Sequence, residues 1–368
     1  MSGPNQIDGA PHPRDTERLF GQDAAQQAFL EAFATGRLHH AWLLTGPRGI
    51  GKATLAWSIA RFLLATPLME DDGLFGAPPA PTSLTIDPEH PVARRIAAGA
   101  EPGLKAITRT PNPTTDRMRD QIVVDDIRSL AGFFQLSATD GGRRVVLVDA
   151  ADEMNPSAAN ALLKMLEEPP ERATLLLISH QPSGLLPTIR SRCRTLRLQS
   201  LSADDMAKAL DQAGVETGKT TAALAELASG SVGAAIRLSL LEGLKTYGDL
   251  TRLIGNLPQF DRAAALKLAE TAAARGGEAK RDLLFELIDL LLSRLARTGA
   301  TGSPPPVEVV PREAATLARL APHQSAGRAW AHTAQETGAR ARHGRAVNLD
   351  PAALVLDTLI KISQTATG

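Results

Sequence analysis

A glycine-rich segment between a short apolar run and a helical pattern constrains the fold of this chain more than any other feature. Residues 46–52 read Gly-Pro-Arg-Gly-Ile-Gly-Lys, after the apolar run 41–44 and before a helical pattern at 55–64. This G-x-x-x-x-G-K spacing is typical of a phosphate-binding loop, in which backbone N–H groups and the start of a helix face an anion. The sequence therefore predicts a nucleotide-phosphate site, with Gly46, Gly49, Gly51 and Lys52 as its binding residues.

The residue after Lys52 departs from this motif. Phosphate-binding loops place Ser or Thr there, because its hydroxyl ligates the Mg²⁺ of the nucleotide, but this chain has Ala53. Thr54 follows one residue later, about 100° further around a helix. We therefore expect a degenerate site that can still cradle an anion, with Thr54 beside it and no complete metal site.

A buried strand farther along the chain supplies the second half of such a site. Residues 145–148 are apolar and Asp149 follows them, which is where P-loop proteins place the acid that orders water around Mg²⁺. The alternative is that Asp149 merely caps the end of the strand and has no role in binding. The next acids, Asp152 and Glu153, are expected to lie too far away to activate an attacking water.

Two later segments carry further polar groups. The apolar run 175–178 ends in Ser179 and His180, where a sensor of the γ-phosphate would lie. Four arginines then follow within eight residues, with no acid among them: Arg190, Arg192, Arg194 and Arg197. Such a cluster suits the phosphates of DNA.

The composition excludes several classes of protein. Forty basic and forty acidic residues cancel, so no global field draws the chain to nucleic acid or to an anionic membrane. The single cysteine among 368 residues, Cys193, excludes a disulfide framework and a cysteine-based zinc site. No run reaches the roughly 18 uncharged apolar residues of a membrane helix. We expect a cytoplasmic protein with no membrane partner.

The order of the patterns predicts the domain organisation. Strands alternate with helices up to about residue 200, which predicts a parallel α/β sheet with helices on both faces, and the rest of the chain is helical. Short helices are expected at 91–98 and 124–136. The predicted parts are a disordered tail at 1–15, a P-loop core domain at 16–200 with an insertion at 66–103, a helical lid domain at 201–241, and an all-α domain at 242–368.

Several segments together resemble the bacterial clamp-loader AAA+ subunits. They are Gly21-Gln22, Leu38-His39-His40-Ala41, the phosphate-binding loop, the block Asn160-Ala-Leu-Leu-Lys-Met-Leu-Glu-Glu-Pro-Pro170, and Ser191-Arg192-Cys193. The resemblance covers about residues 16–241. It implies an AAA+ P-loop parallel-sheet domain, a small helical lid and a C-terminal collar for oligomerisation. It also implies nucleotide sites between neighbouring subunits, with Arg192 acting in trans as an arginine finger.

This chain departs from the active members of that family at three positions. Ala53 lacks the metal-ligating hydroxyl, Ala150 stands where the water-activating glutamate belongs, and Gly233 stands where a sensor arginine belongs. All three groups would serve the chain's own nucleotide, whereas Arg192 would serve a neighbour's. The resemblance therefore implies a non-hydrolysing stator of the DNA polymerase III clamp loader, not an ATPase on its own, which supports loading of the sliding clamp during DNA replication.

The implied partners and cofactors follow from the same resemblance. The partners are the gamma/tau and delta clamp-loader subunits, and the sliding clamp and primed DNA through the complex. ATP is a possible ligand that is not hydrolysed, or the loop is kept for packing alone, and the sequence leaves both open. Many subunits of this family carry a four-cysteine zinc module, but residues 66–103 hold no cysteine, so no zinc is expected.

Two other functions compete with the stator. An active ATPase of the gamma/tau type would need Thr54 and Asp152 to replace the missing groups. A direct DNA binder would use the arginine cluster around Arg192, but neutral net charge and 4% aromatic residues count against it.

Overall fold

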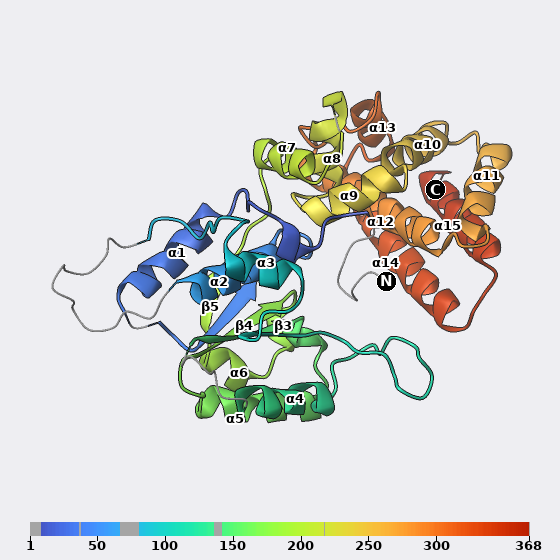
Figure 1. The fold of residues 1–368 in the computed structure, drawn as a ribbon. Coiled ribbons are helices and arrows are strands. Elements are labelled where there is room, and N and C mark those ends of the chain that lie inside the picture. The colour runs from blue at the N-terminus through green and yellow to red at the C-terminus, as the bar shows by residue number, and fades with distance from the viewer. Residues whose placement is uncertain (1–8, 37, 67–80, 136–141, 217, 368) are drawn as a thin grey trace. The chain divides into compact units, whose positions relative to one another are not determined.

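The computed structural model describes residues 9–36, 38–66, 81–135, 142–216 and 218–367. They form two compact units (Figure 1). One comprises Met1–Gly214 with Gly230–Gly233, and the other comprises Val215–Ser229 with Ala234–Gly368. The predicted lid, 201–241, is divided between them, because α7 (Ala203–Gln212) lies in the first unit and α8 (Thr221–Leu227) in the second.

A five-stranded parallel sheet organises the first unit. Its strand order is β2-β3-β4-β1-β5, so the strand before the glycine loop is flanked on both sides. The strands are β1 (Ala41–Thr45), β2 (Leu104–Ile107), β3 (Arg144–Asp149), β4 (Ala173–Ser179) and β5 (Arg194–Arg197). The central strands β1 and β4 are buried along their whole length, including the polar residues Thr45 and Ser179 at their ends. This matches the parallel α/β sheet that the sequence predicts.

Helices cover both faces of this sheet (Figure 1). On one face, Trp42 and Leu44 of β1 pack with α1 and α2. On the other face, Ala41 and Leu43 pack with α4, α5 and α6. Successive residues of a strand point to opposite faces, which explains the division. The helices are α1 (Asp23–Ala34), α2 (Lys52–Ala65), α3 (Pro91–Ala97), α4 (Val124–Gln135), α5 (Pro156–Glu167) and α6 (Pro187–Ser191).

The N-terminal segment is more ordered than a disordered tail at 1–15 would be. From Gly9 the chain is described, and Pro13–Asp15 form a short 3-10 helix packed on α2. The carbonyl of Arg14 accepts a hydrogen bond from Arg61 Nη2 at 2.5 Å, and the ring of His12 lies edge-on to Trp57. These contacts with the first unit correct the prediction for residues 9–15, whereas residues 1–8 lie outside the described ranges.

The insertion predicted at 66–103 is described from residue 81. It contains α3, which confirms the short helix expected at 91–98, and α3 buries Val92, Ala93 and Ile96. Residues 67–80 lie outside the described ranges. The helix expected at 124–136 is α4, up to Gln135.

In the described residues of the second unit the regular structure is helical, as the sequence predicts for its C-terminal part. The long helix α12 is central, because α10, α11, α13 and α14 all pack against it. Helix α9 (Val232–Leu240) begins in the first unit and ends in the second. The other helices are α10 (Gly243–Gly255), α11 (Arg262–Ala273), α12 (Glu278–Thr301), α13 (Glu313–Leu320), α14 (Gln324–Ala346) and α15 (Pro351–Thr367).

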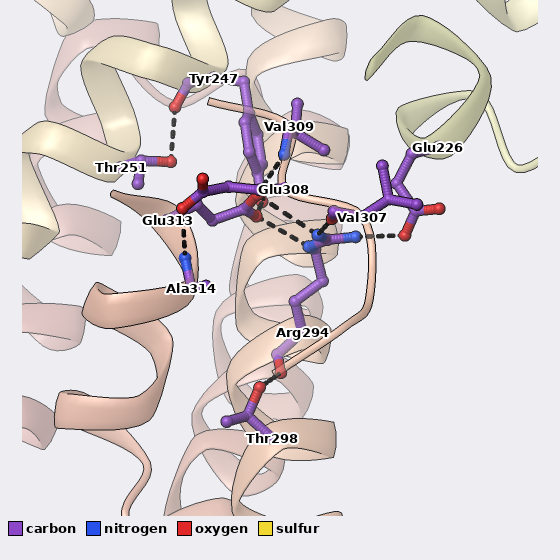
Figure 2. A network of polar contacts seen from close by, with 10 residues as sticks. All are labelled: Glu226, Tyr247, Thr251, Arg294, Thr298, Val307, Glu308, Val309, Glu313 and Ala314. Carbon is purple, nitrogen blue, oxygen red and sulfur yellow. Dashed lines mark hydrogen bonds and ion pairs between the residues drawn. The ribbon is translucent and has the colours of Figure 1, made fainter. Parts of the chain in front are cut away.

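A buried polar network joins four elements of the second unit (Figure 2). Glu313 is fully buried, and its carboxylate accepts hydrogen bonds from Tyr247 Oη at 2.5 Å, Arg294 Nε at 2.8 Å and the backbone N–H of Val309 at 2.7 Å. Arg294 also donates to Glu226 of α8 at 2.6 Å. Burial and the adjacent Glu313 carboxylate raise the pKa of Tyr247 above its usual value. The network thus fixes α8 to α10, α12 and α13.

No single helix in the described ranges has the length and apolar composition needed to cross a membrane, and only the bent pair of α8 and α9 passes that test when its two helices are taken together.

Candidate nucleotide loop and arginine finger

The predicted site residues gather at one edge of the sheet. Parallel strands bring their carboxyl ends to the same edge. Thr45, which precedes the glycine loop, lies beside Ser179 in register, and Asp149 lies beside Ile178 on the next strand. The glycine loop, the acid at the end of β3 and the polar end of β4 are therefore neighbours, as the motif spacing predicts.

The loop adopts a conformation that requires glycine at each glycine position of the motif. Gly46, Gly49 and Gly51 have φ values of 141°, 74° and 99°, which L side chains rarely adopt. A Cβ on Gly46 would lie 2.7 Å from the carbonyl oxygen of Leu198, and one on Gly51 would lie 2.5 Å from Leu19 Cδ1. The glycines thus serve close packing within this unit as well as the shape of an anion cradle.

Lys52 is folded back onto its own loop. Its ammonium donates to the carbonyl oxygens of Gly46, at 2.6 Å, and of Pro47. The side chain is 3% exposed, and burial lowers the pKa of Lys52 to about 8, with Asp152 and Asp149 opposing that shift. The ammonium of the predicted phosphate-binding lysine therefore interacts with two backbone carbonyls and with nearby carboxylates.

The next carbonyls of the loop are bound by residues remote in sequence. Ser231 Oγ donates to the carbonyl of Arg48 at 2.9 Å, and the N–H of Gly233 donates to that of Gly49 at 3.0 Å. Gln22 Nε2 donates to the carbonyl of Ile50 at 3.1 Å. The glycine loop consequently connects α1, α2 and the start of α9. Phosphate would use the N–H groups of the loop, so these bonds leave an anion site chemically feasible.

The catalytic positions around the loop hold few groups suited to hydrolysis. Ala53 and the buried Ala150 offer no oxygen or charge. Asp152 accepts from the backbone N–H groups of His180 and Gln181, at 3.1 and 3.0 Å, and Glu153 forms ion pairs with Arg48 at 2.9 Å and Arg109 at 3.0 Å. Both acids thus have other partners.

The end of β4 carries two buried polar atoms whose partners are not found among the described residues. They are Ser179 Oγ, in a fully buried side chain, and His180 Nδ1. Burial and the adjacent Lys52 lower the pKa of His180 to about 4, so its ring is neutral at pH 7. These atoms, with the glycine cradle, fit a small anion or water. The residues present do not fit a Mg²⁺-nucleotide poised for hydrolysis, because the metal-ligating hydroxyl and the base are missing.

Gly233, which stands where the family resemblance implies a sensor arginine, carries no charge. The nearby Arg237 forms an ion pair with Glu286 at the surface of the second unit. Both side chains of this pair are partly exposed, so Arg237 is a surface charge.

Arg192 lies at the surface. It caps the C-terminal end of the short helix α6, where its N–H bonds the carbonyl of Ile189 at 3.1 Å. Its side chain is 36% exposed. Nη2 pairs with Glu167 Oε1 of α5 at 2.8 Å, and Nη1 donates to the carbonyl of Thr188 at 3.1 Å. The next residue, Cys193, is partly buried, and burial raises the pKa of its thiol to about 12, so it is not a reactive thiolate.

Some residues of the site are not evident from the sequence alone. The pairing of Glu167 with Arg192 and the bonds of Gln22 and Ser231 to the loop have no local signature. Gln22 and Glu167 do lie inside the segments that carry the family resemblance, which is the only feature of the sequence that sets them apart. In the described ranges, no group of three or more His, Cys, Asp and Glu side chains is placed to hold a metal ion.

Comparisons with known proteins identify relatives among DNA polymerase III subunits. A sequence model of the family described as "DNA polymerase III, delta subunit" matches residues 21–202. Over 154 residues, or 42% of the chain, the sequence is 43% identical to DNA polymerase III subunit delta' of Pseudomonas aeruginosa, with 41% of that protein covered. Over 286 residues, or 74% of the chain, it is 30% identical to subunit tau of Escherichia coli, with 40% of that protein covered. The chain thus spans about two fifths of the length of these relatives.

Among solved structures, the chain is similar to a DNA polymerase III gamma subunit-related protein of Thermotoga maritima. That likeness has 18% identity and a TM-score of 0.43, and it covers 92% of this chain and 99% of that one. The sheet, the glycine loop and the sequence matches together place the chain in the clamp-loader AAA+ family of DNA polymerase III subunits.

Proposed function

We propose that this chain is the non-hydrolysing stator, of the delta' type, in a DNA polymerase III clamp loader. In this proposal it supplies Arg192 to the nucleotide site of a neighbouring gamma/tau subunit. The observation that carries the proposal is the contrast between the two sites. Arg192 is at the surface and keeps N–H donors that are not bound by the described residues of the chain. The chain's own loop, in contrast, lacks a metal-ligating hydroxyl, a catalytic base and a sensor arginine.

A neighbouring subunit can use only those N–H donors of Arg192 that this chain does not itself bind. A guanidinium has five N–H donors in a rigid fork. In Arg192, two of its nitrogens have the protein partners named above, so other N–H groups remain for phosphate. An arginine finger contributes about 10³ or more to turnover of the nucleotide it contacts. The proposed role is therefore to complete a neighbour's site.

The chain's own loop has a structural role in this proposal. Lys52, Ser231, Gly233 and Gln22 bind consecutive loop carbonyls and hold the loop to the rest of the unit. An anion or nucleotide held by the loop is not turned over, because no group at positions 53 and 150 can ligate Mg²⁺ or activate water. The proposed partners are gamma/tau and delta subunits, and the sliding clamp and primed DNA through the complex, in the cytoplasm.

The test is Arg192→Ala in a complex reconstituted from cognate gamma/tau and delta subunits. We expect assembly on a sizing column to be unchanged, while ATP turnover stimulated by primed DNA and sliding clamp falls, because one neighbouring site loses its finger. Arg190→Ala is the matched control, since Arg190 is an exposed arginine two residues away. Equal turnover of the wild-type and Arg192→Ala complexes would rule out the finger.

An ATPase of the gamma/tau type is the second candidate, because the match to tau covers more of this chain than the match to delta' does. The isolated chain with Mg²⁺-ATP distinguishes the two. The stator has no measurable turnover alone, whereas turnover near 1 s⁻¹, within the range of ordinary enzymes, would establish the ATPase.

A further inference from the structure

We propose that Glu167 is a positioning residue for Arg192, which holds the guanidinium ready to meet a phosphate on a neighbouring subunit. This inference rests on the proposed function and adds a second residue to the same site. The observation is the ion pair between Arg192 Nη2 and Glu167 Oε1 at 2.8 Å, together with the bond from Nη1 to the carbonyl of Thr188 at 3.1 Å.

The two contacts fix the direction of a long side chain. An arginine at a surface samples many rotamers, and this freedom is lost when it binds a partner. Here Thr188 and Glu167 hold the two terminal nitrogens from different elements, α6 and the end of α5. Part of that conformational entropy is therefore lost before the neighbour arrives, which favours the bound geometry.

The pair is weak enough to permit its proposed use. Arg192 is 36% exposed and Glu167 is 49% exposed. Exposed pairs of this kind change an equilibrium by about two- to five-fold. The N–H groups that face neither Glu167 nor Thr188 can bind a phosphate oxygen while Glu167 keeps its contact. A fully buried pair would instead lock the guanidinium within its own fold.

The location of Glu167 argues against a role in the stability of its own helix. It is the last residue of α5, where a carboxylate faces the negative end of the helix dipole. Its contribution to the helix itself is therefore unfavourable, and its favourable partner is Arg192. Glu168, the following residue, is also exposed at the same helix end and forms no ion pair among the described residues, so it provides a matched control.

The experiment measures the finger-dependent turnover of the reconstituted complex, defined as the turnover of wild type minus that of Arg192→Ala. With primed DNA and sliding clamp present, Glu167→Ala should reduce this quantity about two- to five-fold. The decrease should lie in kcat with the KM for ATP unchanged, since a finger acts in the transition state. Glu167→Gln, which keeps an acceptor oxygen at the same reach, should retain most of it, and Glu168→Ala should retain all of it.

The double variant Glu167→Ala/Arg192→Ala should match Arg192→Ala alone, because Glu167 acts through that guanidinium. Thermal unfolding of Glu167→Ala should be unchanged or shifted upward, given the helix dipole. Full finger-dependent turnover in Glu167→Ala would overturn the positioning role while leaving the finger in place. An increase would overturn it as well, because Glu167 would then restrain Arg192. An Arg192→Ala complex with unchanged turnover would instead defeat the proposed function itself.

Discussion

At the scale of single residues, the glycine loop shows how a binding motif can also serve packing. Gly49 lies against the Ser231–Gly233 segment, where its carbonyl accepts from the N–H of Gly233 at 3.0 Å and a Cβ would lie 2.3 Å from Ser231 Oγ. Such contacts give this position a structural reason to remain glycine even if no nucleotide is hydrolysed. The same loop in an active ATPase would be constrained by phosphate as well.

The packing role of Gly49 predicts a stability difference between two glycine substitutions. Gly49→Ala should destabilise the chain by about 2–4 kcal/mol, because the strained φ and the clash with Ser231 act together. Gly36→Ala has nearly the same φ, 68° against 74°, with nothing within 4 Å of the added Cβ, so it should cost only about 1 kcal/mol. Thermal unfolding with both variants checks this, and equal losses would show that the contact with Ser231 is unimportant.

At the scale of elements, the close crossing of α12 and α14 organises the second unit. Gly299 of α12 and Gly327 of α14 face each other, and a Cβ on Gly299 would lie 2.6 Å from the Cα of Gly327. Backbones can approach this closely only where both residues lack side chains. The sequence predicts an all-α domain at 242–368 but does not show that these two glycines meet, because the pattern of one helix does not indicate which face of another helix it contacts.

The crossing predicts opposite effects for two Gly→Ala substitutions in helices. Gly299→Ala should destabilise the chain by about 1–3 kcal/mol, since the added methyl group meets backbone rather than a flexible side chain. In Gly338→Ala of α14, the added Cβ meets the tip of Arg342 at 3.4 Å and the carboxylate of Asp289 at 3.7 and 3.9 Å. Both are ends of side chains at ordinary contact distances, so the better helix propensity of Ala should stabilise the chain by about 0.5–1 kcal/mol. Urea denaturation measures both, and a gain in stability for Gly299→Ala would contradict the close crossing.

At the scale of the whole molecule, each of the two units is stabilised by a different kind of interior. The first unit has apolar cores on both faces of its sheet. The second contains, within its helical core, the buried network of Glu313, Arg294 and Tyr247. A buried ion pair costs desolvation, but removal of one partner leaves the other uncompensated. This network is therefore sensitive to single substitutions even though it contributes little net stability.

The network predicts a large loss from one arginine and a small loss from another. Arg294→Met should destabilise the second unit by about 3–5 kcal/mol, because Glu313 stays buried without its cation. Arg237→Met, which removes the surface pair with Glu286, should cost less than about 1 kcal/mol. Hydrogen exchange of amides in α10, α12 and α13 reports on this unit alone. Similar protection in the two variants would show that the buried charges are not coupled.

Local chemistry in the sequence determined much of the fold and part of the site. Glycines at 46, 49 and 51 predict a phosphate-binding loop, and all three have positive φ in the structure. The apolar runs before Asp149 and Ser179 predict strands of a parallel sheet, and these strands are neighbours in it. The alanines at 53 and 150 indicate by their identity alone that the site lacks key groups. These predictions depend on backbone geometry and on side-chain types at fixed spacing, which are properties of neighbouring residues.

The tertiary structure alone decided which partners those residues have. Lys52 turns onto its own loop, Ser231 bonds the carbonyl of Arg48 across 183 positions of sequence, and Glu167 meets Arg192. The N-terminal segment from Gly9 also proves to be packed rather than disordered. Each of these outcomes depends on which elements the sheet order brings together. The partner of a side chain is one of several groups that folding brings near it from distant segments. Spacing along the chain therefore cannot specify that partner.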